Sequence, residues 1–225
     1  MKKRILALLL LFLMIISFVI PLASKTIKKT NKNDDSEIQQ KPDDVTICKN
    51  VTYTVMQQKA IQKDEVEIAI EEMAKEMEAI ESITDNKEYF IAYQQIVEKY
   101  SEVIDPPETI YDYYTEDEIE LICQVVETEC YDADFDSKCN VVSVVFNRFE
   151  SEKFNGTITQ IITAKNQFAY GRRNISEDTR LAVMYVFEFG DTTNGALYFH
   201  SNPKTDKFNG SDYIFTDSVG HCFYK

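Results

Sequence analysis

The sequence predicts an α+β protein that is mainly helical, with a small β-hairpin region near its C-terminus. Two observations lead to this prediction. Between residues 58 and 189, several segments place apolar residues at three- and four-residue steps, which is the period of one helix face. After residue 195, short runs alternate aromatic with polar residues and are separated by Asn-Pro and Asn-Gly, which is typical of hairpins.

The composition describes a strongly acidic chain that has enough apolar residues to fold. The 225 residues are 44% hydrophobic, and 24 Lys and Arg face 38 Asp and Glu, so the net charge is 24 − 38 = −14. The large apolar side chains exclude wholesale disorder. Because this negative charge would repel a phosphate backbone, we expect no nucleic-acid partner.

The N-terminus is typical of an export segment. A basic head precedes an apolar stretch over residues 5–23. That stretch is long enough to anchor the chain in a bilayer, and residues 21–24 form a poor cleavage site, so a signal peptide over 1–24 and a membrane anchor both remain open. We expect the exported chain to continue as a linker over 25–57, where the first twenty residues are almost all polar.

The next part of the chain predicts a pair of amphipathic helices. Residues 58–82 and 87–103 each carry apolar residues at helical spacing, with a short polar turn between them. The second run ends before the adjacent prolines Pro106 and Pro107, which mark a boundary. We therefore expect a helical spacer over 58–106, with its helices at 58–103 able to meet a protein partner.

Residues 107–225 are expected to form a catalytic domain. Thr115 and Glu118 make a capping box before a helix that ends near Glu129, and an acidic loop is expected to follow it. The other expected helices span 141–149, 157–163 and 176–189, and the expected strands span 196–199, 213–215 and 222–224.

The five cysteines indicate a disulfide rather than a metal site. An exported chain can form disulfides, and an odd number leaves at least one thiol unpaired. Neither a C-x-x-C pair nor a Cys/His spacing typical of zinc ligands is present. We expect no metal and no cofactor.

Glu129 is the candidate catalytic residue that the local pattern suggests. It follows the apolar run 121–126 at the end of a helix, where partial burial and the helix dipole disfavour the charged form of a carboxyl group. A carboxyl group that keeps its proton can act as a general acid on a glycosidic oxygen. The same pattern also fits Glu127, Glu129 and Asp132 as acidic residues that only solvate a helix end.

Six short segments, taken together, carry a resemblance to a known family. These segments are Leu121–Cys130, Asn140–Arg148, Asn166–Phe168, Gly195–Phe199, Asn202-Pro203 and Gly220–Tyr224. Their order and spacing resemble the SleB-type cell-wall hydrolase domain of spore-cortex-lytic enzymes, over about residues 115–225. Several positions depart from the family pattern. Cys130 replaces a common Ala, Glu127 stands where an aromatic residue is frequent, Arg172-Arg173 follow the Asn166–Phe168 segment where other members often differ, and His200-Ser201 extend the Asn-Pro loop.

The resemblance implies a lysozyme-like domain that cleaves the bond between N-acetylmuramic acid and N-acetylglucosamine in peptidoglycan glycan strands. It places the catalytic acid on Glu129 and implies a lytic transglycosylase, in which one carboxyl group is first an acid and then a base. It also implies a role in spore cortex lysis during germination, at the cell wall or spore envelope.

The resemblance further implies which residues bind the sugar. Gln167, Phe168 and Tyr170 would line the groove, where aromatic faces can stack on pyranose rings. Asn202 would add an amide contact. Because strand residues alternate between faces, only one of Tyr198 and Phe199 should face the groove, and we favour Tyr198.

Two other functions remain open. A wall peptidase or amidase with a Cys nucleophile would need a His base, but Cys123 lies inside an apolar helix and Cys222 is next to His221 in sequence. A non-catalytic wall-binding or assembly protein would keep the groove without turnover.

Overall fold

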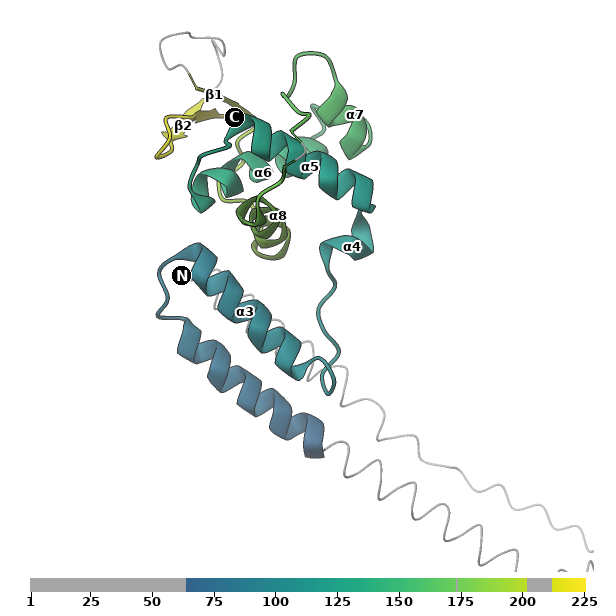
Figure 1. The fold of residues 1–225 in the computed structure, drawn as a ribbon, viewed down its shortest axis with the longest axis vertical. Coiled ribbons are helices and arrows are strands. Elements are labelled where there is room, and N and C mark those ends of the chain that lie inside the picture. The colour runs from purple at the N-terminus through teal and green to yellow at the C-terminus, as the bar shows by residue number, and fades with distance from the viewer. Residues whose placement is uncertain (1–63, 173, 202–211) are drawn as a thin grey trace, which may run out of the picture. The chain divides into compact units, whose positions relative to one another are not determined.

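The computed structural model describes residues 64–172, 174–201 and 212–225, and it confirms a mainly helical α+β fold with a small sheet (Figure 1). The export segment and the linker that we expected over 1–57 lie outside these residues. The elements are a helix over 64–80, α3 (Asn86–Tyr100), α4 (Ile110–Tyr113), α5 (Glu116–Glu129), α6 (Phe135–Glu150), α7 (Ile158–Thr163), α8 (Glu177–Phe189), β1 (Tyr198–His200), β2 (Tyr213–Thr216) and β3 (Cys222–Tyr224).

Side-chain caps set the starts of the helices in the C-terminal part. Thr115, Thr157 and Ser176 each accept a hydrogen bond from a backbone N–H in the first turn of the helix that follows. Asp134 does the same for α6, with a bond of 2.8 Å from the Ser137 amide. The acidic loop that we expected over 132–136 was therefore wrong in its second half, because Asp134 caps a helix that begins at Phe135, six residues before the expected start at 141.

The core of the C-terminal part is built around α6. Its valines at 141, 142, 144 and 145 are fully buried, and the helix packs against α5, α7 and α8. Such continuous burial explains why α6 reads as an apolar run in the sequence. In the part of the chain that the structure describes, no helix is long and apolar enough to cross a membrane.

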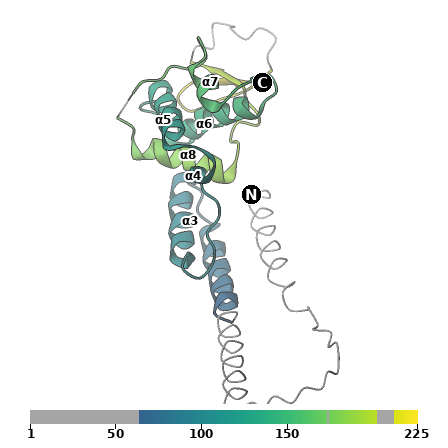
Figure 2. The ribbon, with the colours of Figure 1, turned by 90° about the vertical axis from the view of Figure 1, so that its right-hand side faces the viewer.

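The helices expected to form a spacer share this core. α3 lies against α8 (Figure 2), and Phe90 packs edge-on against Tyr185 and Phe189, with ring centroids 5.6 and 5.8 Å apart. An ion pair of 2.7 Å between Lys87 and Asp178 adds to the contact. Residues 63–225 form one compact unit. α3, which we expected to belong to a spacer, is thus packed onto the C-terminal helices.

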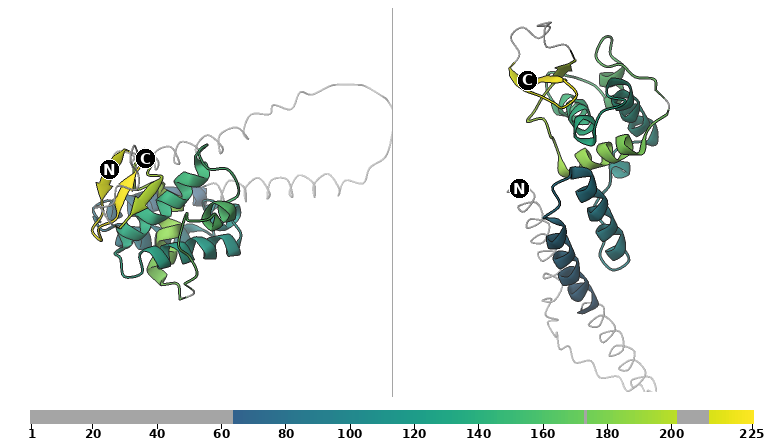
Figure 3. Two further views of the ribbon diagram at one scale, coloured as in Figure 1. Left: turned by 90° about the horizontal axis from the view of Figure 1, so that it is seen from above. Right: turned by 60° about the vertical axis from the view of Figure 1, so that its left-hand side comes forward.

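The three strands form an antiparallel sheet in the order β1-β3-β2. Phe223 on the central strand pairs with Phe199 and Phe215, and its ring stacks on Phe215 at 4.8 Å. The sheet lies on the side of the helices that is remote from α3 (Figure 3). This arrangement brings β1 next to the C-terminal half of α6.

Candidate active site

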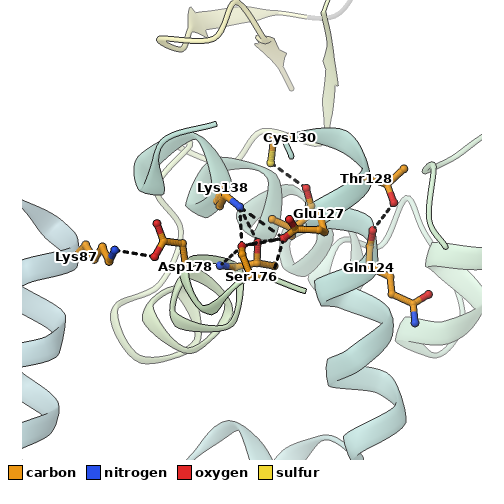
Figure 4. Close-up of polar contacts among 10 residues, drawn as sticks. Lys87, Gln124, Glu127, Thr128, Cys130, Lys138, Ser176 and Asp178 are labelled. Carbon is orange, nitrogen blue, oxygen red and sulfur yellow. Dashed lines mark hydrogen bonds and ion pairs between the residues drawn. The ribbon is translucent and has the colours of Figure 1, made fainter. Parts of the chain in front are cut away.

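The last turn of α5 carries two carboxylates that meet different surroundings. Glu127 is 1% exposed, and its Oε2 accepts hydrogen bonds from the Thr179 hydroxyl at 2.5 Å and from the Ser176 hydroxyl at 3.0 Å. The ammonium group of Lys138, itself 3% exposed, lies 3.6 Å from the same oxygen. Figure 4 shows these groups converging from α5, α6 and the start of α8.

The network around Glu127 keeps this carboxylate ionised. Burial by itself raises the pKa of Glu127. The Thr179 hydroxyl, the Ser176 amide and hydroxyl, and the Lys138 charge lower it by more than burial raises it, so the net shift is downward. A buried ion pair with all its partners in place is a structural device. Glu127 therefore fastens α5 to α8 and is not available as an acid.

Glu129 is half-buried and is held by the loop that follows α7. Its Oε1 accepts a hydrogen bond of 2.7 Å from the backbone N–H of Ala169. A backbone N–H is only a donor, so Oε1 acts as an acceptor and any proton on this carboxyl group sits on Oε2. The neighbouring Thr128 hydroxyl bonds to the Gln124 carbonyl at 2.7 Å (Figure 4) and accepts from the Arg172 amide at 3.4 Å.

Arg148, near the C-terminal end of α6, is a site residue that the sequence analysis did not single out. It is 4% exposed, its Nε donates to the Leu197 carbonyl at 2.6 Å, and its Nη1 donates to Gln167 Oε1 at 3.1 Å. Three aromatic rings lie around the guanidinium, at 4.3 Å for Phe168, 5.1 Å for Phe154 and 5.5 Å for Tyr198. An Arg after an apolar helical run is the only sign of this role in the sequence.

The charge of Arg148 interacts with that of Glu129. Burial lowers the pKa of Arg148 to about 10, while the neighbouring Tyr198 and Glu129 partly oppose that shift. The guanidinium is therefore still charged at neutral pH. Among the described residues, no carboxylate forms an ion pair with it.

The structure places the predicted sugar-binding residues in different settings. Gln167 is exposed and contacts Arg148, whereas Phe168 is only 9% exposed and supports the Arg148 guanidinium from one side. Tyr170 is 45% exposed in the same loop. Tyr198 is half-buried beside Arg148, and Asn202 lies outside the described residues.

Phe199 is also half-buried, but it packs into the sheet. Its ring contacts Phe223 at 5.8 Å and His221 at 5.5 Å, whereas the Tyr198 ring lies toward Phe154 at 6.0 Å. The two side chains thus have different neighbours, as strand alternation requires.

The four described cysteines are free and buried, at positions 123, 130, 139 and 222. The expected disulfide is therefore wrong for these four, and Cys48 lies outside the described residues. Burial raises the pKa of Cys123 and of Cys130 to about 12 and raises that of Cys139 as well, so these three remain thiols. No group of His, Cys, Asp and Glu in the described ranges is arranged to hold a metal ion.

A cavity of about 420 Å³ lies elsewhere, between α3, α4 and α8. Its walls include Phe90, Tyr93, Phe187 and Glu188, and the Tyr93 hydroxyl donates to the Glu188 carboxylate at 2.5 Å. None of the residues around Glu129 lines it. The cavity is therefore separate from the candidate site.

Comparison with known proteins shows what this part of the chain is similar to. Residues 133–224 match the model of the Cell Wall Hydrolase family. The C-terminal part of the chain is thus similar to cell wall hydrolases. Glu129 lies four residues before the matched range.

Two solved structures are similar to this chain. The catalytic domain of the Bacillus cereus SleB protein shares 22% identity and covers 50% of this chain and 92% of its own, with a TM-score of 0.45. The catalytic domain of the germination-specific lytic transglycosylase SleB from Bacillus anthracis shares 21% identity and covers 51% and 98%, with a TM-score of 0.46. The comparison with curated proteins gave no match.

Proposed function

We propose that this protein is a lytic transglycosylase that cleaves the bond between N-acetylmuramic acid and N-acetylglucosamine, with Glu129 as its one acid and base. The observation that carries the proposal is the contrast at the end of α5. Glu127 is committed to Lys138, Ser176 and Thr179, so it cannot serve as a second catalytic carboxylate. Glu129 has one oxygen fixed by Ala169 and the other free to carry a proton.

In this mechanism Glu129 acts twice. Its Oε2–H gives the proton to the glycosidic oxygen, and the bond from that oxygen to C1 of the muramoyl residue breaks, which leaves an oxocarbenium-like sugar. The Glu129 carboxylate then takes the proton from the C6 hydroxyl of the same residue, whose oxygen bonds to C1. The products are a 1,6-anhydro end and a free N-acetylglucosamine 4-hydroxyl, and Glu129 is protonated again without the use of water.

The products of a peptidoglycan digest test this proposal. Mass spectrometry should find anhydromuramic ends with the wild-type protein and none with Glu129→Gln, while the variant still binds peptidoglycan. Reducing ends would instead show hydrolysis by water, and cleaved peptide bonds would show a wall peptidase. Binding without any cleavage by the wild type would show a non-catalytic wall protein.

The cellular setting is proposed from the sequence alone. The apolar stretch over 5–23 supports export, followed by release to the cell envelope or retention in the membrane. Fractionation of cells that carry the full chain, and the same experiment without residues 1–24, would locate it. A role in cortex lysis predicts that spores of a deletion strain stall in germination.

The helices at 58–103 are proposed to meet a protein partner. In the described part of this range, Ile68 is 58% exposed and Ile91 is 36% exposed, so each presents an apolar surface to the surroundings. Replacing both with Lys should leave wall digestion by the pure protein intact. Loss of localisation in cells with full activity in vitro would support a partner.

A further inference from the structure

We propose that Arg148 is a positioning residue for Glu129. It fixes the loop segment 167–169 that orients the carboxyl group, and its charge stabilises the carboxylate that Glu129 becomes after it has given up its proton. The inference rests on the function proposed above and assigns a second residue to the same chemistry.

The first step of the argument is a continuous set of contacts. Arg148 is held from β1 by the Leu197 carbonyl, at 2.6 Å from Nε, and it holds Gln167 through a bond of 3.1 Å from Nη1. The Phe168 ring packs on the guanidinium at 4.3 Å. The next residue, Ala169, donates its N–H to Glu129 Oε1 at 2.7 Å. Each of residues 167–169 therefore has one contact that fixes it, and the contact of Ala169 orients the Glu129 carboxyl group.

The second step concerns the charge. A buried cation is expensive unless a carboxylate neutralises it, and the other buried cation of this domain, Lys138, has such a partner in Glu127. Arg148 is 4% exposed and, among the described residues, is surrounded by a carbonyl, an amide and three rings instead. An apolar residue would fill this position without the free-energy cost of removing a charge from water. The charge is therefore better explained by what it does to Glu129.

The third step is the direction of that effect. The negative charge of Glu129 raises the pKa of Arg148, so the two charges attract each other across the site. A protonated Glu129 is neutral and gains little from the guanidinium. The carboxylate that develops as the proton leaves gains more, which lowers the barrier to proton transfer.

The other titratable groups near the pair leave this interpretation intact. They are Tyr198 on β1, Cys130 beside Glu129 on the end of α5, Glu127 with Lys138 from α6, Asp217 from the turn between β2 and β3, and Arg172 in the loop before α8. Burial keeps the Cys130 thiol neutral, and Glu127 is balanced by Lys138. Arg172 lies over the Tyr131 ring at 3.9 Å. Of the two buried cations Lys138 and Arg148, Arg148 is thus the one that has no ion pair within the described residues.

Two substitutions at Arg148 separate position from charge. Arg148→Lys keeps the charge but cannot reach the Leu197 carbonyl and Gln167 together, so kcat should fall about tenfold with an unchanged pH profile. Arg148→Gln removes the charge as well, so kcat should fall further, by about 100-fold, with a smaller change in KM. Arg180→Lys is the matched control, since Arg180 forms an exposed ion pair with Glu120 at 3.0 Å, and it should change neither quantity.

A measurement that needs no activity accompanies the kinetics. The Ala169 N–H, followed by NMR hydrogen exchange in the intact protein, should exchange faster in Arg148→Gln than in the wild type, because the segment that holds its bond to Glu129 is released. If Arg148→Gln does not fold, Gln167→Ala takes its place for the position alone: it breaks the link to the loop, so kcat should fall and the Ala169 N–H should exchange faster, while Arg148→Lys still tests whether the charge suffices.

The outcomes distinguish this inference from the proposed function. An active wild type whose Arg148→Gln variant has the same kcat and the same exchange rate at the Ala169 N–H would overturn the inference and leave the function standing. A wild type that releases no anhydromuramic ends, but whose Ala169 N–H exchanges faster in Arg148→Gln, would overturn the function and keep the positioning of the segment by Arg148.

Discussion

The two sides of the last turn of α5 differ in how their carboxylates are held. On the inner side, Glu127 has three hydrogen bonds and an ion pair, and all of its partners are buried or half-buried. On the other side, the structure gives Glu129 one backbone bond and an electrostatic partner that is not in contact as an ion pair. The comparison shows a structural carboxylate that is saturated with partners, whereas the carboxylate that we propose as the acid keeps one oxygen free.

The largest effect should come from Glu129→Gln, the strongest test of this difference. The variant keeps the acceptor for the Ala169 N–H but has no proton to give, so we expect a loss of at least about 1,000-fold in kcat. Thermal unfolding should change little, because a half-buried residue with one bond is replaced by an isostere. Peptidoglycan turnover and calorimetry measure the two quantities. Retained turnover would mean that the acid lies elsewhere.

Glu127→Gln should lower the stability of the fold and leave the activity intact, which is the reverse of what we expect for Glu129→Gln. It leaves the Lys138 ammonium buried without a counter-charge, so we expect the free energy of unfolding to fall by about 3 kcal/mol. Denaturant titration measures this loss. At a temperature where the variant is folded, it should still release the same products as the wild type. A variant that is stable but inactive would contradict the structural role that we assign to Glu127.

The Ala169 N–H can be removed to test how Glu129 is oriented. Ala169→Pro lacks the donor, and we expect kcat to fall about tenfold with a smaller change in KM, since the bond orients the acid and not the substrate. Ala169→Gly keeps the N–H and serves as the control. Equal kcat in the two variants would mean that the bond does not orient the acid.

The difference in stability between the wild type and Glu127→Gln should depend on pH. Because the pKa of Glu127 lies below its ordinary value of 4.5, the ionised network stabilises the fold fully above that pH and loses its contribution as the pH falls through the folded pKa. The stability difference between the wild type and Glu127→Gln should therefore shrink below about pH 4.5. Denaturant titrations at pH 7, 5 and 3.5 measure it. A constant difference would show that Glu127 is not ionised in the fold.

The smallest effect is expected from the thiols. With their pKa values raised to about 12 by burial, Cys123 and Cys130 should not react with a thiol reagent in the native state, and reducing agent should leave activity unchanged. Cys130→Ser tests the thiol next to the acid directly, and its turnover should stay within about threefold of the wild type. Rapid inactivation by the reagent at Cys130 would reopen the thiol mechanism.

Local rules predicted more of the fold than of the site. The start of α5 followed from the capping box of Thr115 and Glu118, because a cap and the helix that it starts are neighbours in sequence. The starts of α7 and α8 followed, within one residue, from the helical spacing of their apolar residues. The early start of α6 was missed, since Asp134 stands in a run of acidic residues that reads as a loop. The short helix α4 was not predicted either, although Thr109 and Asp112 cap it.

The site depends on contacts between residues far apart in the sequence. Glu129 was found because a carboxyl group at the end of an apolar helix stands out locally. Arg148 was not, because its meaning depends on Leu197 and on Gln167, which are 49 and 19 residues away. The structural role of Glu127 was missed for the same reason, as Thr179 is 52 residues away. The disulfide expectation rested on counting cysteines, which says nothing about which sulfur atoms meet.

The packing of α3 on α8 has a practical consequence for anyone who produces this protein. A fragment cut at the prolines, at residue 107, would uncover the rings of Tyr185 and Phe189 that now rest against Phe90. This exposed apolar patch would lie on α8, the helix whose first turn binds Glu127, and we expect such a fragment to aggregate in solution. A shortened version should begin ahead of residue 64 to keep the rings covered.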